Sequence, residues 1–407
     1  MDAYDMGKYA YSTVPLYYNL AEKLQLDIDG ISFEGFPIVD KGFYVDSGMS
    51  MISSSSIPDY MNQRLYYTRT SGSTGKFSEV YWKKEDYNRS LASLWIWRKK
   101  YYQITPGDKM VYFYPADRGE LKCVDTGNCL AISRKYLSDG RLTEAYEKIL
   151  AYDPEWMILQ PALALLLSNI AGKYRKIPRS LRYIEFTGEF LEVSVRRQIE
   201  RIFQCATANQ YGTKEVNSIA YECPEGTLHL MQDNVYLETV GDQEEGQLCV
   251  TSLNNFAMPF VRFNLEDRGR IIRNKVCACG RCTDALELYA GRSNDWIQCR
   301  DGRKIHSYTL VQMVHQVNYE MDGQIIQYQI IQQDYDCFEI ILVLDEKDAF
   351  AEISEYLKRC FWEKLGKGTG IDVQLSDSLL PSEKTGKLAD FISNVDSGEE
   401  SAEISAD

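Results

Sequence analysis

The sequence predicts an α/β protein with a large N-terminal α/β domain and a small α+β domain at the C-terminal end. The first observation is length, because 407 residues exceed what one ordinary core accommodates. The second is the alternation of β-rich runs with amphipathic helical patterns between residues 64 and 203. The third is a change after Gly291, where strand and helix signals follow the order β-α-β-β-α-β.

The large domain is predicted from strands that alternate with helices. Leu91, Leu94 and Trp95 lie at positions i, i+3 and i+4, which indicates one buried face of a helix. Alternation of this kind favours strands that pair in parallel, at least in part. The strands are predicted at residues 64–69, 109–114, 156–160 and 183–186, and the helices at residues 84–102, 143–151, 162–173 and 193–203.

The C-terminal half is predicted to be richer in strands. The large domain continues with β-rich runs at residues 235–240, 247–252 and 269–273. The small domain is predicted as a strand at 296–299, a helix at 308–317, strands at 325–333 and 337–344, a helix at 349–365 and a strand at 371–375. The predicted domains therefore span residues 1–290 and 291–396. Residues 397–407 are acidic and poor in apolar side chains, which predicts a disordered tail.

Composition narrows the classes of partner. A formal net charge of −14 argues against a broad nucleic-acid-binding face. No run approaches the ~20 apolar residues of a membrane span, and the first residues lack a basic and then apolar export signal. We therefore expect a cytoplasmic protein without a membrane partner; a homodimer is one assembly that the sequence allows. The odd count of 11 cysteines favours reduced thiols or a metal site over a disulfide framework.

A Gly/Ser-rich loop is the first candidate for chemistry. It reads Thr70-Ser71-Gly72-Ser73-Thr74-Gly75-Lys76 and directly follows a predicted strand. The glycines let the backbone approach an anion, the hydroxyls and successive N–H groups can donate to phosphate, and the lysine adds charge. The spacing is not that of the GxxxxGK[ST] loop. A flexible polar turn is the alternative, but the ordered alternation after a strand favours phosphate binding.

This loop resembles the signature of the adenylate-forming acyl-CoA synthetase superfamily, and later blocks of the chain follow the family's order. The branch that it resembles is that of phenylacetate–CoA ligase, with capsule-biosynthesis-like and indoleacetate–lysine-ligase-like relatives. Many members of the superfamily carry a second lysine where this chain has Ser78. The resemblance implies a large ATP- and acid-binding domain of adenylate-forming type, followed by a small mobile domain.

Two further blocks resemble the adenine and phosphate sites of that family. Asn209–Glu215 (NQYGTKE) is similar to the family's YGxTE block. The resemblance implies that Tyr211 and Gly212 lie near adenine, Thr213 near the α-phosphate and Glu215 near Mg²⁺. A carboxylate beside a triphosphate makes physical sense with a cation between them. Lys214 departs from the family, which tends to have an apolar or hydroxyl residue there. Phe186–Glu189 (FTGE) is similar to the GAE block, which implies that Gly188 and Glu189 line the adenine pocket.

The blocks around the domain junction resemble ribose-binding and hinge motifs. Pro259–Asp267 is similar to the family's P-x-x-RYRTGD block, which implies that Asp267 accepts hydrogen bonds from the ribose hydroxyls. Glu266 replaces the usual glycine, and a surface ion pair is the alternative interpretation of Arg262 and Asp267. Gly291–Asp295 is similar to the GRxxD block, which implies a pivot at Asn294 and places Arg292 near the ribose or the interface.

The end of the chain resembles the block that carries the family's adenylation lysine. Pro381–Lys387 (PSEKTGK) is similar to P-R-x-x-x-GK, with Ser382 in place of arginine. The resemblance implies that Lys387 reaches the carboxylate and the α-phosphate, where an ammonium stabilises developing negative charge. A carboxylate is already ionised, so no general base is needed, which fits a chain with 3 histidines. An exposed loop lysine is the alternative, and Lys384 is the nearest rival.

A cluster of cysteines predicts a structural zinc site. Cys277-Ala278-Cys279-Gly280-Arg281-Cys282 is dense in thiols, and Cys223 and His229 form a C-x₅-H pair upstream. Three thiolates and an imidazole suit tetrahedral Zn²⁺, and the same pairing resembles the phenylacetate–CoA ligase branch. The candidate ligands are Cys223, His229, Cys277 and Cys279, with Cys282 as the competitor. Reduced, half-buried thiols are the alternative.

Together these features predict an enzyme that binds ATP and Mg²⁺ and activates a small-molecule carboxylic acid as an acyl-adenylate with release of pyrophosphate. The resemblance implies an aromatic or arylacetic acid and CoA as the acceptor. The acid pocket is expected to draw on residues 109–117 and on the segment before Tyr211. An amine, as in an amide ligase, and a carrier protein remain alternative acceptors; the segment Phe33–Pro37 (FEGFP) resembles the amide-forming branch. A non-catalytic nucleotide-binding homologue is the second alternative.

Overall fold

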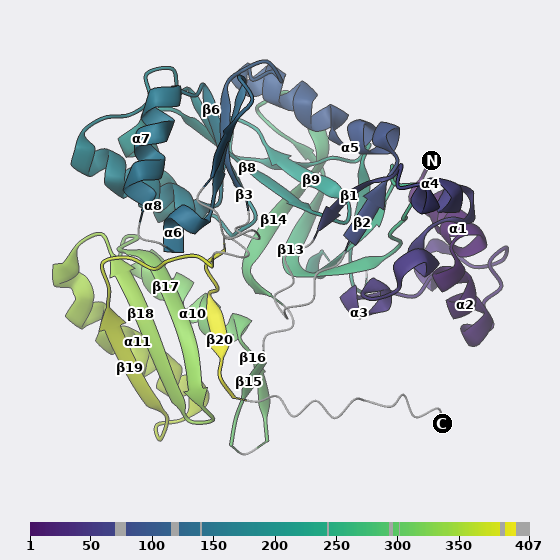
Figure 1. The fold of residues 1–407 in the computed structure, drawn as a ribbon. Helices are drawn as coiled ribbons and strands as arrows, with labels where there is room; N and C mark the ends of the chain where they lie inside the picture. Colours follow the sequence, from purple (N-terminus) through teal and green to yellow (C-terminus); the bar gives the residue numbers. More distant parts are fainter. Residues whose placement is uncertain are drawn as a thin grey trace. The chain divides into compact units, whose positions relative to one another are not determined.

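The structure is a computed structural model with two compact units (Figure 1). It describes residues 1–69, 79–114, 122–138, 141–241, 244–292, 296–300, 302–382 and 387–395. The large unit comprises Met1–Leu191, Arg196–Tyr289 and Ser382–Lys387, and the small unit comprises Glu192–Val195, Ala290–Pro381 and the residues from Leu388 onward. The predicted tail at 397–407 lies outside the described residues.

Helices of the large unit begin at residues that suit helix termini. Asp2 caps the first helix by accepting a hydrogen bond from the N–H of Asp5 at 2.8 Å, and Pro15 and Pro161 occupy first-turn positions where no N–H is needed. The helices are α1 (Ala3–Thr13), α2 (Pro15–Leu24), α3 (Lys41–Tyr44), α4 (Ile57–Met61), α5 (Lys84–Trp97), α6 (Lys135–Ser138), α7 (Leu142–Tyr152), α8 (Pro161–Tyr174) and α9 (Val193–Phe203).

A 12-stranded mixed sheet forms the frame of the large unit, in the order β11-β12-β13-β14-β10-β9-β8-β7-β6-β3-β5-β4. Its strands are β3 (Met110–Tyr114), β4 (Cys123–Asp125), β5 (Cys129–Ser133), β6 (Trp156–Leu159), β7 (Tyr183–Thr187), β8 (Ala206–Thr213), β9 (Asn217–Glu222), β10 (Leu228–Leu230), β11 (Val235–Thr239), β12 (Glu245–Ser252), β13 (Phe263–Val276) and β14 (Cys282–Arg292). A separate antiparallel pair joins β1 (Tyr66–Arg69) to β2 (Glu79–Trp82).

Five of these strands, β5, β3, β6, β7 and β8, are parallel neighbours, which confirms the predicted parallel pairing. Helices α7 and α8 lie on one side of them and α5 on the other (Figure 1). Burial on both faces explains the continuous apolar run of β6 and the buried side chains of β7. The helix predicted at 84–102 ends at Trp97 and continues as a π-helical turn, η4 (Arg98–Tyr102).

The π-helical turn inserts a buried ion pair between α5 and the sheet. Arg98 is 6% exposed, and its Nε lies 2.7 Å from Oε2 of Glu185 on β7. The rings of Trp95 and Trp156 lie 4.5 and 5.2 Å from the guanidinium carbon and cover it. Because a buried pair needs such close geometry, this contact fixes α5 against the parallel strands.

The antiparallel half packs against the N-terminal helices around a second buried arginine. Arg262 is 8% exposed; it pairs with Glu238 at 2.8 and 3.0 Å and donates to the carbonyl oxygens of Phe36, at 2.8 Å, and Glu34. The interpretation of Arg262 as a surface ion pair is therefore wrong. Its contacts also give the 33–37 segment a structural role that does not depend on the acceptor.

The small unit contains a four-stranded sheet in the order β19-β18-β17-β20. Its core joins both helices to the strands through apolar side chains that are almost fully buried. The elements are β15 (Trp296–Gln298), β16 (Lys304–His306), α10 (Tyr308–Glu320), β17 (Ile325–Asp334), β18 (Cys337–Leu344), α11 (Phe350–Leu365), β19 (Gly370–Leu375) and β20 (Phe391–Ser393).

The predicted order of strands in the small unit needs one correction. The strand predicted at 296–299 does not join the four-stranded sheet, because β15 pairs with β16 in a separate hairpin. The fourth place is taken by β20, which lies parallel to β17 and was not predicted. Among the helices that the structure describes, none is both long and apolar enough to span a membrane.

Candidate functional site

The parallel strands of the large unit end at one common edge of the sheet. The Cα partners Tyr114 and Ser133 close β3 and β5, and Thr187 on β7 is level with Gln210 on β8. Ligands of open α/β sheets bind outside the carboxyl ends of parallel strands. The predicted Gly188, Glu189 and Thr213–Glu215 all follow or end such strands, so the fold places them at this edge.

A close turn after β8 presents the predicted phosphate and magnesium residues. Gly212 pairs with Ser218 on β9, and a Cβ at Gly212 would clash with the carbonyl oxygen of Asn217. Only glycine therefore permits this approach of the two strands. The Thr213 hydroxyl is buried and makes no hydrogen bond within the described part of the chain. A buried hydroxyl of this kind needs a partner, which a bound ligand could supply.

Glu215 is a buried carboxylate held from one side. Its side chain is 7% exposed, and its Oε1 accepts a hydrogen bond from the Tyr44 hydroxyl at 2.5 Å. Tyr44 belongs to α3, far away in the sequence, and packs edge-on against Phe260 and Phe263. A carboxylate has several lone pairs, so this hydrogen bond orients Glu215 and leaves it able to act as a metal ligand.

Tyr211 and Asp267, predicted at the adenine and ribose ends of a nucleoside, lie in direct contact. The Tyr211 hydroxyl donates to Oδ2 of Asp267 at 2.7 Å. Glu266, at the position where the resembling family has glycine, takes a left-handed φ of 61°. Its backbone N–H donates to the side chain of Asn264 at 2.9 Å, which supports the turn. The loop therefore keeps a glycine-like conformation despite the glutamate.

Lys387 lies at the same edge, because its side chain approaches Gly188 at the end of β7. The segment Ser382–Lys387 belongs to the large unit. The N–H of Ser382 donates to the carbonyl oxygen of Lys387 at 2.9 Å and closes the loop. A Cβ built on Gly188, just beyond β7, would lie 3.7 Å from Cε of Lys387. The backbone at position 188 also has a φ of 83°, a left-handed conformation that favours glycine.

Glu189, the next predicted residue, accepts a hydrogen bond from the backbone N–H of Ala162 at 2.9 Å and so caps the first turn of α8.

Two cations at the edge act on each other. Arg134 directly follows β5 and is 7% exposed, and Lys214 lies on the turn between β8 and β9. Desolvation by surrounding protein atoms lowers the pKa of Lys214, and the charge of Arg134 lowers it further, while Glu215 opposes both effects. Sequence reasoning missed Arg134 and Tyr44. Arg134 could have been noticed as a charged residue that directly follows an apolar strand. The sequence around Tyr44 carries no signal of a functional role.

The predicted metal ligands meet in the antiparallel half. The ligand atoms of Cys223, His229, Cys277 and Cys279 all lie within 4.8 Å of one another. The Sγ atoms of Cys223 and Cys277 are 3.7 Å apart, and Sγ of Cys279 is 3.3 Å from Nε2 of His229. Cys282, the competing candidate, is exposed and bonds instead to the carbonyl oxygen of Asn274 at 3.6 Å.

The surroundings of the cluster suit a metal ion. Nδ1 of His229 lies 2.8 Å from the Thr283 hydroxyl, which orients the ring so that Nε2 faces the thiols. Burial lowers the pKa of His229 to about 4, which keeps the imidazole neutral. A hydrogen bond with Thr227 lowers the pKa of Cys277 to about 7. The Tyr101 hydroxyl donates to Sγ of Cys279 at 3.5 Å. This donor set fits tetrahedral Zn²⁺.

Several predicted residues cannot be placed. Thr70–Lys76, Ser78 and Asn294 lie outside the described residues, as do Lys384 and residues 115–117 of the expected acid pocket. Arg292 ends β14, and its side chain is outside the description.

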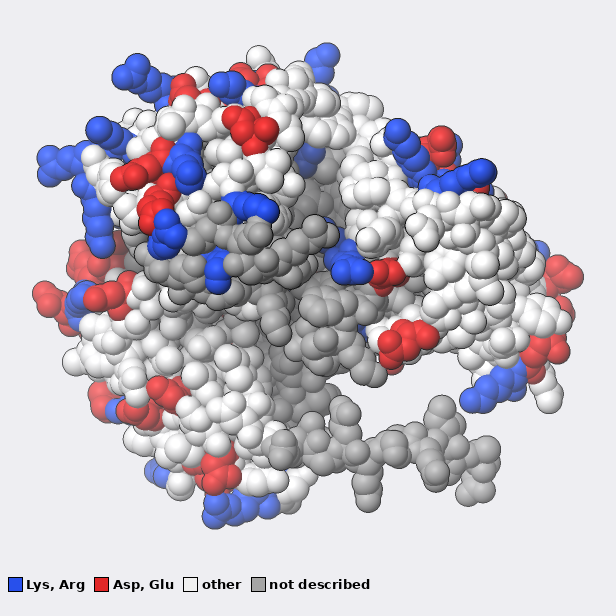
Figure 2. Space-filling view, viewed as in Figure 1, with Lys and Arg blue, Asp and Glu red and all other residues white. Residues whose placement is uncertain are grey.

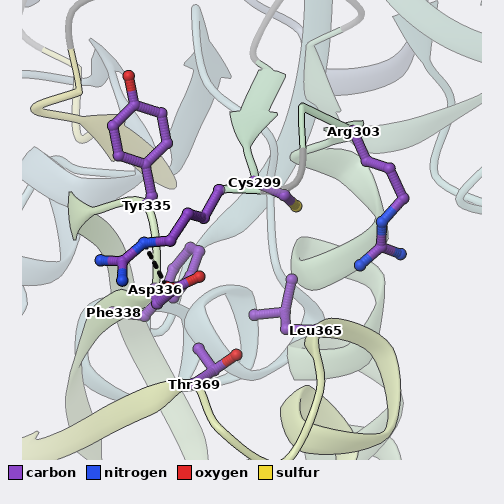
Figure 3. Close-up of a pocket in the computed structure, with 8 residues that line it drawn as sticks. Cys299, Arg303, Tyr335, Asp336, Phe338, Leu365 and Thr369 are labelled. Atoms are coloured by element: carbon purple, nitrogen blue, oxygen red, sulfur yellow. Dashed lines mark ion pairs between the residues drawn. The ribbon is translucent and has the colours of Figure 1, made fainter.

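A cavity of ≈ 150 Å³ in the small unit holds none of the predicted site residues (Figure 3). Its wall includes Cys299, Leu365 and the ion pair between Arg300 and Asp336, whose nearest atoms lie 2.9 Å apart. On the face shown in Figure 2, the described acidic and basic side chains are interspersed, without a broad basic surface.

Comparison with known proteins places this geometry in context. The C-terminal domain of CapK matches residues 297–394. Phenylacetate-coenzyme A ligase of Escherichia coli (strain K12) is 25% identical over 316 residues, which cover 72% of this chain and 70% of the relative. Protein CapK of Staphylococcus aureus is 24% identical over 349 residues, which cover 82% of this chain and 75% of the relative.

Solved structures extend the likeness to the fold. A 2-hydroxyisobutyryl-CoA ligase in the postadenylation state, in complex with R3-HIB-AMP, aligns with a TM-score of 0.71 at 17% identity and covers 96% of this chain and 89% of that chain. Together with the two relatives, this structure bears out the predicted resemblance to adenylate-forming ligases. An open form of the same ligase, in complex with 2-HIB-AMP and CoA, aligns with a TM-score of 0.59 at 18% identity. The alignment covers 96% of this chain and 89% of that chain. The α/β class predicted for this adenylate-forming fold is confirmed with it.

Proposed function

We propose that the chain activates a carboxylic acid with ATP and transfers the acyl group to CoA. The relatives include ligases named for phenylacetate and coenzyme A, and the aligned ligase structures hold acyl-adenylates. Two observations support the proposal. Thr213 and Glu215 lie at the end of β8, where Tyr211 contacts Asp267, and Lys387 lies beside Gly188 at the end of the neighbouring strand β7.

The first half-reaction follows from the order of these groups. A carboxylate oxygen of the acid attacks the α-phosphorus of ATP, the bond to the β-phosphate oxygen breaks, and pyrophosphate leaves with its electron pair. The Lys387 ammonium stabilises the negative charge that builds on the α-phosphate and carboxylate oxygens. The buried Thr213 hydroxyl donates to the same phosphate. Tyr211 and Asp267 hold the nucleoside, with Asp267 accepting from the ribose hydroxyls.

We assign Mg²⁺ to Glu215. The Tyr44 hydrogen bond aims this buried carboxylate, and hard oxygen ligands suit the ion. When bound, Mg²⁺ neutralises phosphate charge. The Gly/Ser-rich loop at residues 70–76 is our proposed binding segment for the triphosphate, with its lysine as the charge partner.

In the second half-reaction we propose that the CoA thiolate attacks the acyl carbon and that AMP leaves. One of the aligned ligase structures contains CoA together with an acyl-adenylate. The acceptor is tested by incubating enzyme, ATP and acid with CoA, with amino acids or with a phosphopantetheinylated carrier protein, and weighing the products. A product formed with an amine or a carrier protein, and none with CoA, would replace the thioester step. The expectation of an aromatic or arylacetic acid remains a prediction for the same assay.

We also propose that Cys223, His229, Cys277 and Cys279 hold a structural Zn²⁺. Four protein donors complete a tetrahedral shell, so the ion would serve folding and leave no position for substrate. The location we propose is the cytoplasm, because none of the 11 cysteines forms a disulfide in the structure. A folded, active preparation with far less than one zinc per chain would remove the metal from the proposal.

The activation step is tested by carboxylate-dependent ATP–pyrophosphate exchange with a panel of aliphatic and aromatic acids. We expect exchange that depends on the acid and on Mg²⁺. No exchange with any member of a broad panel, from protein that still binds ATP, would favour a non-catalytic nucleotide-binding homologue.

A further inference from the structure

The carboxyl edge carries a glutamine whose side chain has no role in the fold or in the activation chemistry above. Gln160 directly follows β6 and precedes Pro161, the first residue of α8. Its side chain is half-buried, and its carboxamide makes no hydrogen bond with the described part of the chain. A carboxamide offers two N–H donors and one carbonyl acceptor. At an edge where ligands bind, these groups are available to a substrate.

A second glutamine on the same edge shows the opposite behaviour. The register of β6, β7 and β8 puts Gln160 level with Thr187, whose Cα partner is Gln210. The Thr187 hydroxyl donates to Oε1 of Gln210 at 2.8 Å, and Nε2 of Gln210 donates to the carbonyl oxygen of Tyr211 at 3.2 Å. The carboxamide of Gln210 is therefore used within the fold, whereas that of Gln160 is not.

The Gln160 carboxamide lies beside the proposed reacting centre. A Cβ built on Gly188 would lie 3.7 Å from Cγ and 4.0 Å from Nε2 of Gln160, and 3.7 Å from Cε of Lys387. The two long side chains therefore flank one point just beyond β7, and the glycine keeps that point free of side-chain atoms. All three residues belong to the large unit.

The order of the strands says which part of the substrate Gln160 would meet. In the proposed reaction the nucleoside lies at the Tyr211–Asp267 contact, on β8 and β13. The reacting centre lies at the end of β7, and β6 is the next strand on the side away from β8. Gln160 therefore approaches the reacting centre from the side away from the nucleoside, which is the side left for the acid.

We propose that Gln160 is a further catalytic residue, whose carboxamide N–H donates to the oxygen of the acid that becomes the acyl carbonyl. When the CoA thiolate forms the C–S bond, the π electrons of the carbonyl move onto this oxygen. The tetrahedral intermediate then collapses and AMP leaves with its electron pair. The hydrogen bond strengthens as charge builds on the oxygen, so it favours the transfer step. The inference rests on the proposed activation of the acid and its transfer to CoA.

Gln160→Met tests the inference, because methionine keeps the length of the side chain and removes its N–H donors. Enzyme in excess is mixed with CoA and a synthetic acyl-adenylate of an acid that supports exchange by wild type, and thioester formation is followed through one turnover. We expect the rate to fall by about a hundredfold, as for loss of one oxyanion donor. In ATP–pyrophosphate exchange the KM for the acid should rise, while the KM for ATP should stay within about twofold of wild type.

Gln316→Met is the matched control, because Gln316 is exposed and its Nε2 donates to Glu320 within the same helix, α10; its rates should equal those of wild type. The melting temperature of Gln160→Met should be unchanged, since α8 uses only the backbone carbonyl of Gln160, which accepts from the N–H of Ala164. Gln160→Glu, which places a negative charge beside the oxyanion, should slow the transfer further and decides the case if Gln160→Met does not fold.

Transfer at the wild-type rate in either folded variant would overturn the inference and leave the proposed activation standing. A raised KM for ATP with unchanged transfer would also overturn it, because Gln160 would then serve the nucleotide. Failure of wild type itself to form a thioester from the acyl-adenylate would count against the proposed transfer to CoA, and absence of exchange with all acids against the proposed activation.

Discussion

The two halves of the large sheet use polar side chains in opposite ways. In the parallel half, charged and hydroxyl groups gather at the ends of strands, and the buried Thr213 hydroxyl has no partner among the described residues. In the antiparallel half, Cys223, His229, Cys277 and Cys279 face one another, and Thr283 occupies the other nitrogen of the imidazole. The first arrangement is open to a ligand, whereas the second is closed. The difference supports our proposal that the open strand ends serve the reaction and the closed Cys/His cluster serves stability.

The largest expected effect comes from the open half. Lys387→Ala should lower acid-dependent ATP–pyrophosphate exchange by about a thousandfold, because no other group replaces an ammonium at the developing charge. The melting temperature and ATP binding should change little. Lys367→Ala, at an exposed lysine in the small unit, is the matched control. Unchanged exchange in Lys387→Ala would remove the lysine from the reaction.

Breaking a buried ion pair in the closed half should mainly change stability. Arg262→Met strands Glu238 and two backbone carbonyls, so we expect the free energy of unfolding to fall by about 3–5 kcal/mol. Urea denaturation measures this directly. Arg270→Met removes an exposed pair with Glu244 and should cost less than about 1 kcal/mol. Equal losses in the two variants would contradict the assigned burial.

Loss of the metal should affect stability more than activity, which would distinguish the two halves of the sheet further. Cys279→Ser should lower the zinc content well below one per chain and destabilise the fold by about 2–3 kcal/mol, a fraction of the binding free energy of a structural zinc. The molecules that stay folded should retain exchange activity. Cys282→Ser, at the exposed neighbour, should leave zinc and stability as in wild type. A loss of zinc in Cys282→Ser alone would reverse the choice of ligands.

The smallest effect is expected at Glu266, whose φ of 61° is strained for a residue with a side chain. Glu266→Gly should stabilise the protein by up to about 1 kcal/mol, since relief of strain exceeds the added entropy of the unfolded chain. The same substitution at Glu355, exposed in the middle of α11, should destabilise by about 1 kcal/mol. Thermal unfolding of both variants checks the signs; destabilisation of both would mean that the side chain of Glu266 makes a necessary contact.

Local patterns were sufficient for much of the fold. The apolar run of β6 predicted a buried strand, and the alternation of strands with helices predicted parallel pairing. Pairing partners that depend on distant segments could not be predicted. The three-residue strand β20 is defined by its contact with β17. The strand at 296–299 was predicted, but its pairing with β16 was not, because a short strand carries no information about its partner.

The site shows the same division. The metal cluster was predictable because thiols and an imidazole at close spacing have few other uses together. The contact of Tyr44 with Glu215 was not predictable, because the two residues are 171 positions apart in the sequence and only the fold brings α3 to Glu215. The position of Arg134 could not be predicted either. Only the order of the five parallel strands shows that the end of β5 lies on the same edge of the sheet as Gly188.

The central claim is that the carboxylate of the acid attacks the α-phosphate of ATP at this edge. Acid labelled with ¹⁸O in its carboxylate tests it most directly, with AMP, pyrophosphate and product analysed by mass after one turnover in the presence of the acceptor. The account predicts one ¹⁸O atom in AMP, none in pyrophosphate, and no labelled AMP from Lys387→Ala. Label in inorganic phosphate or pyrophosphate, or acyl product formed with unlabelled AMP, would contradict it.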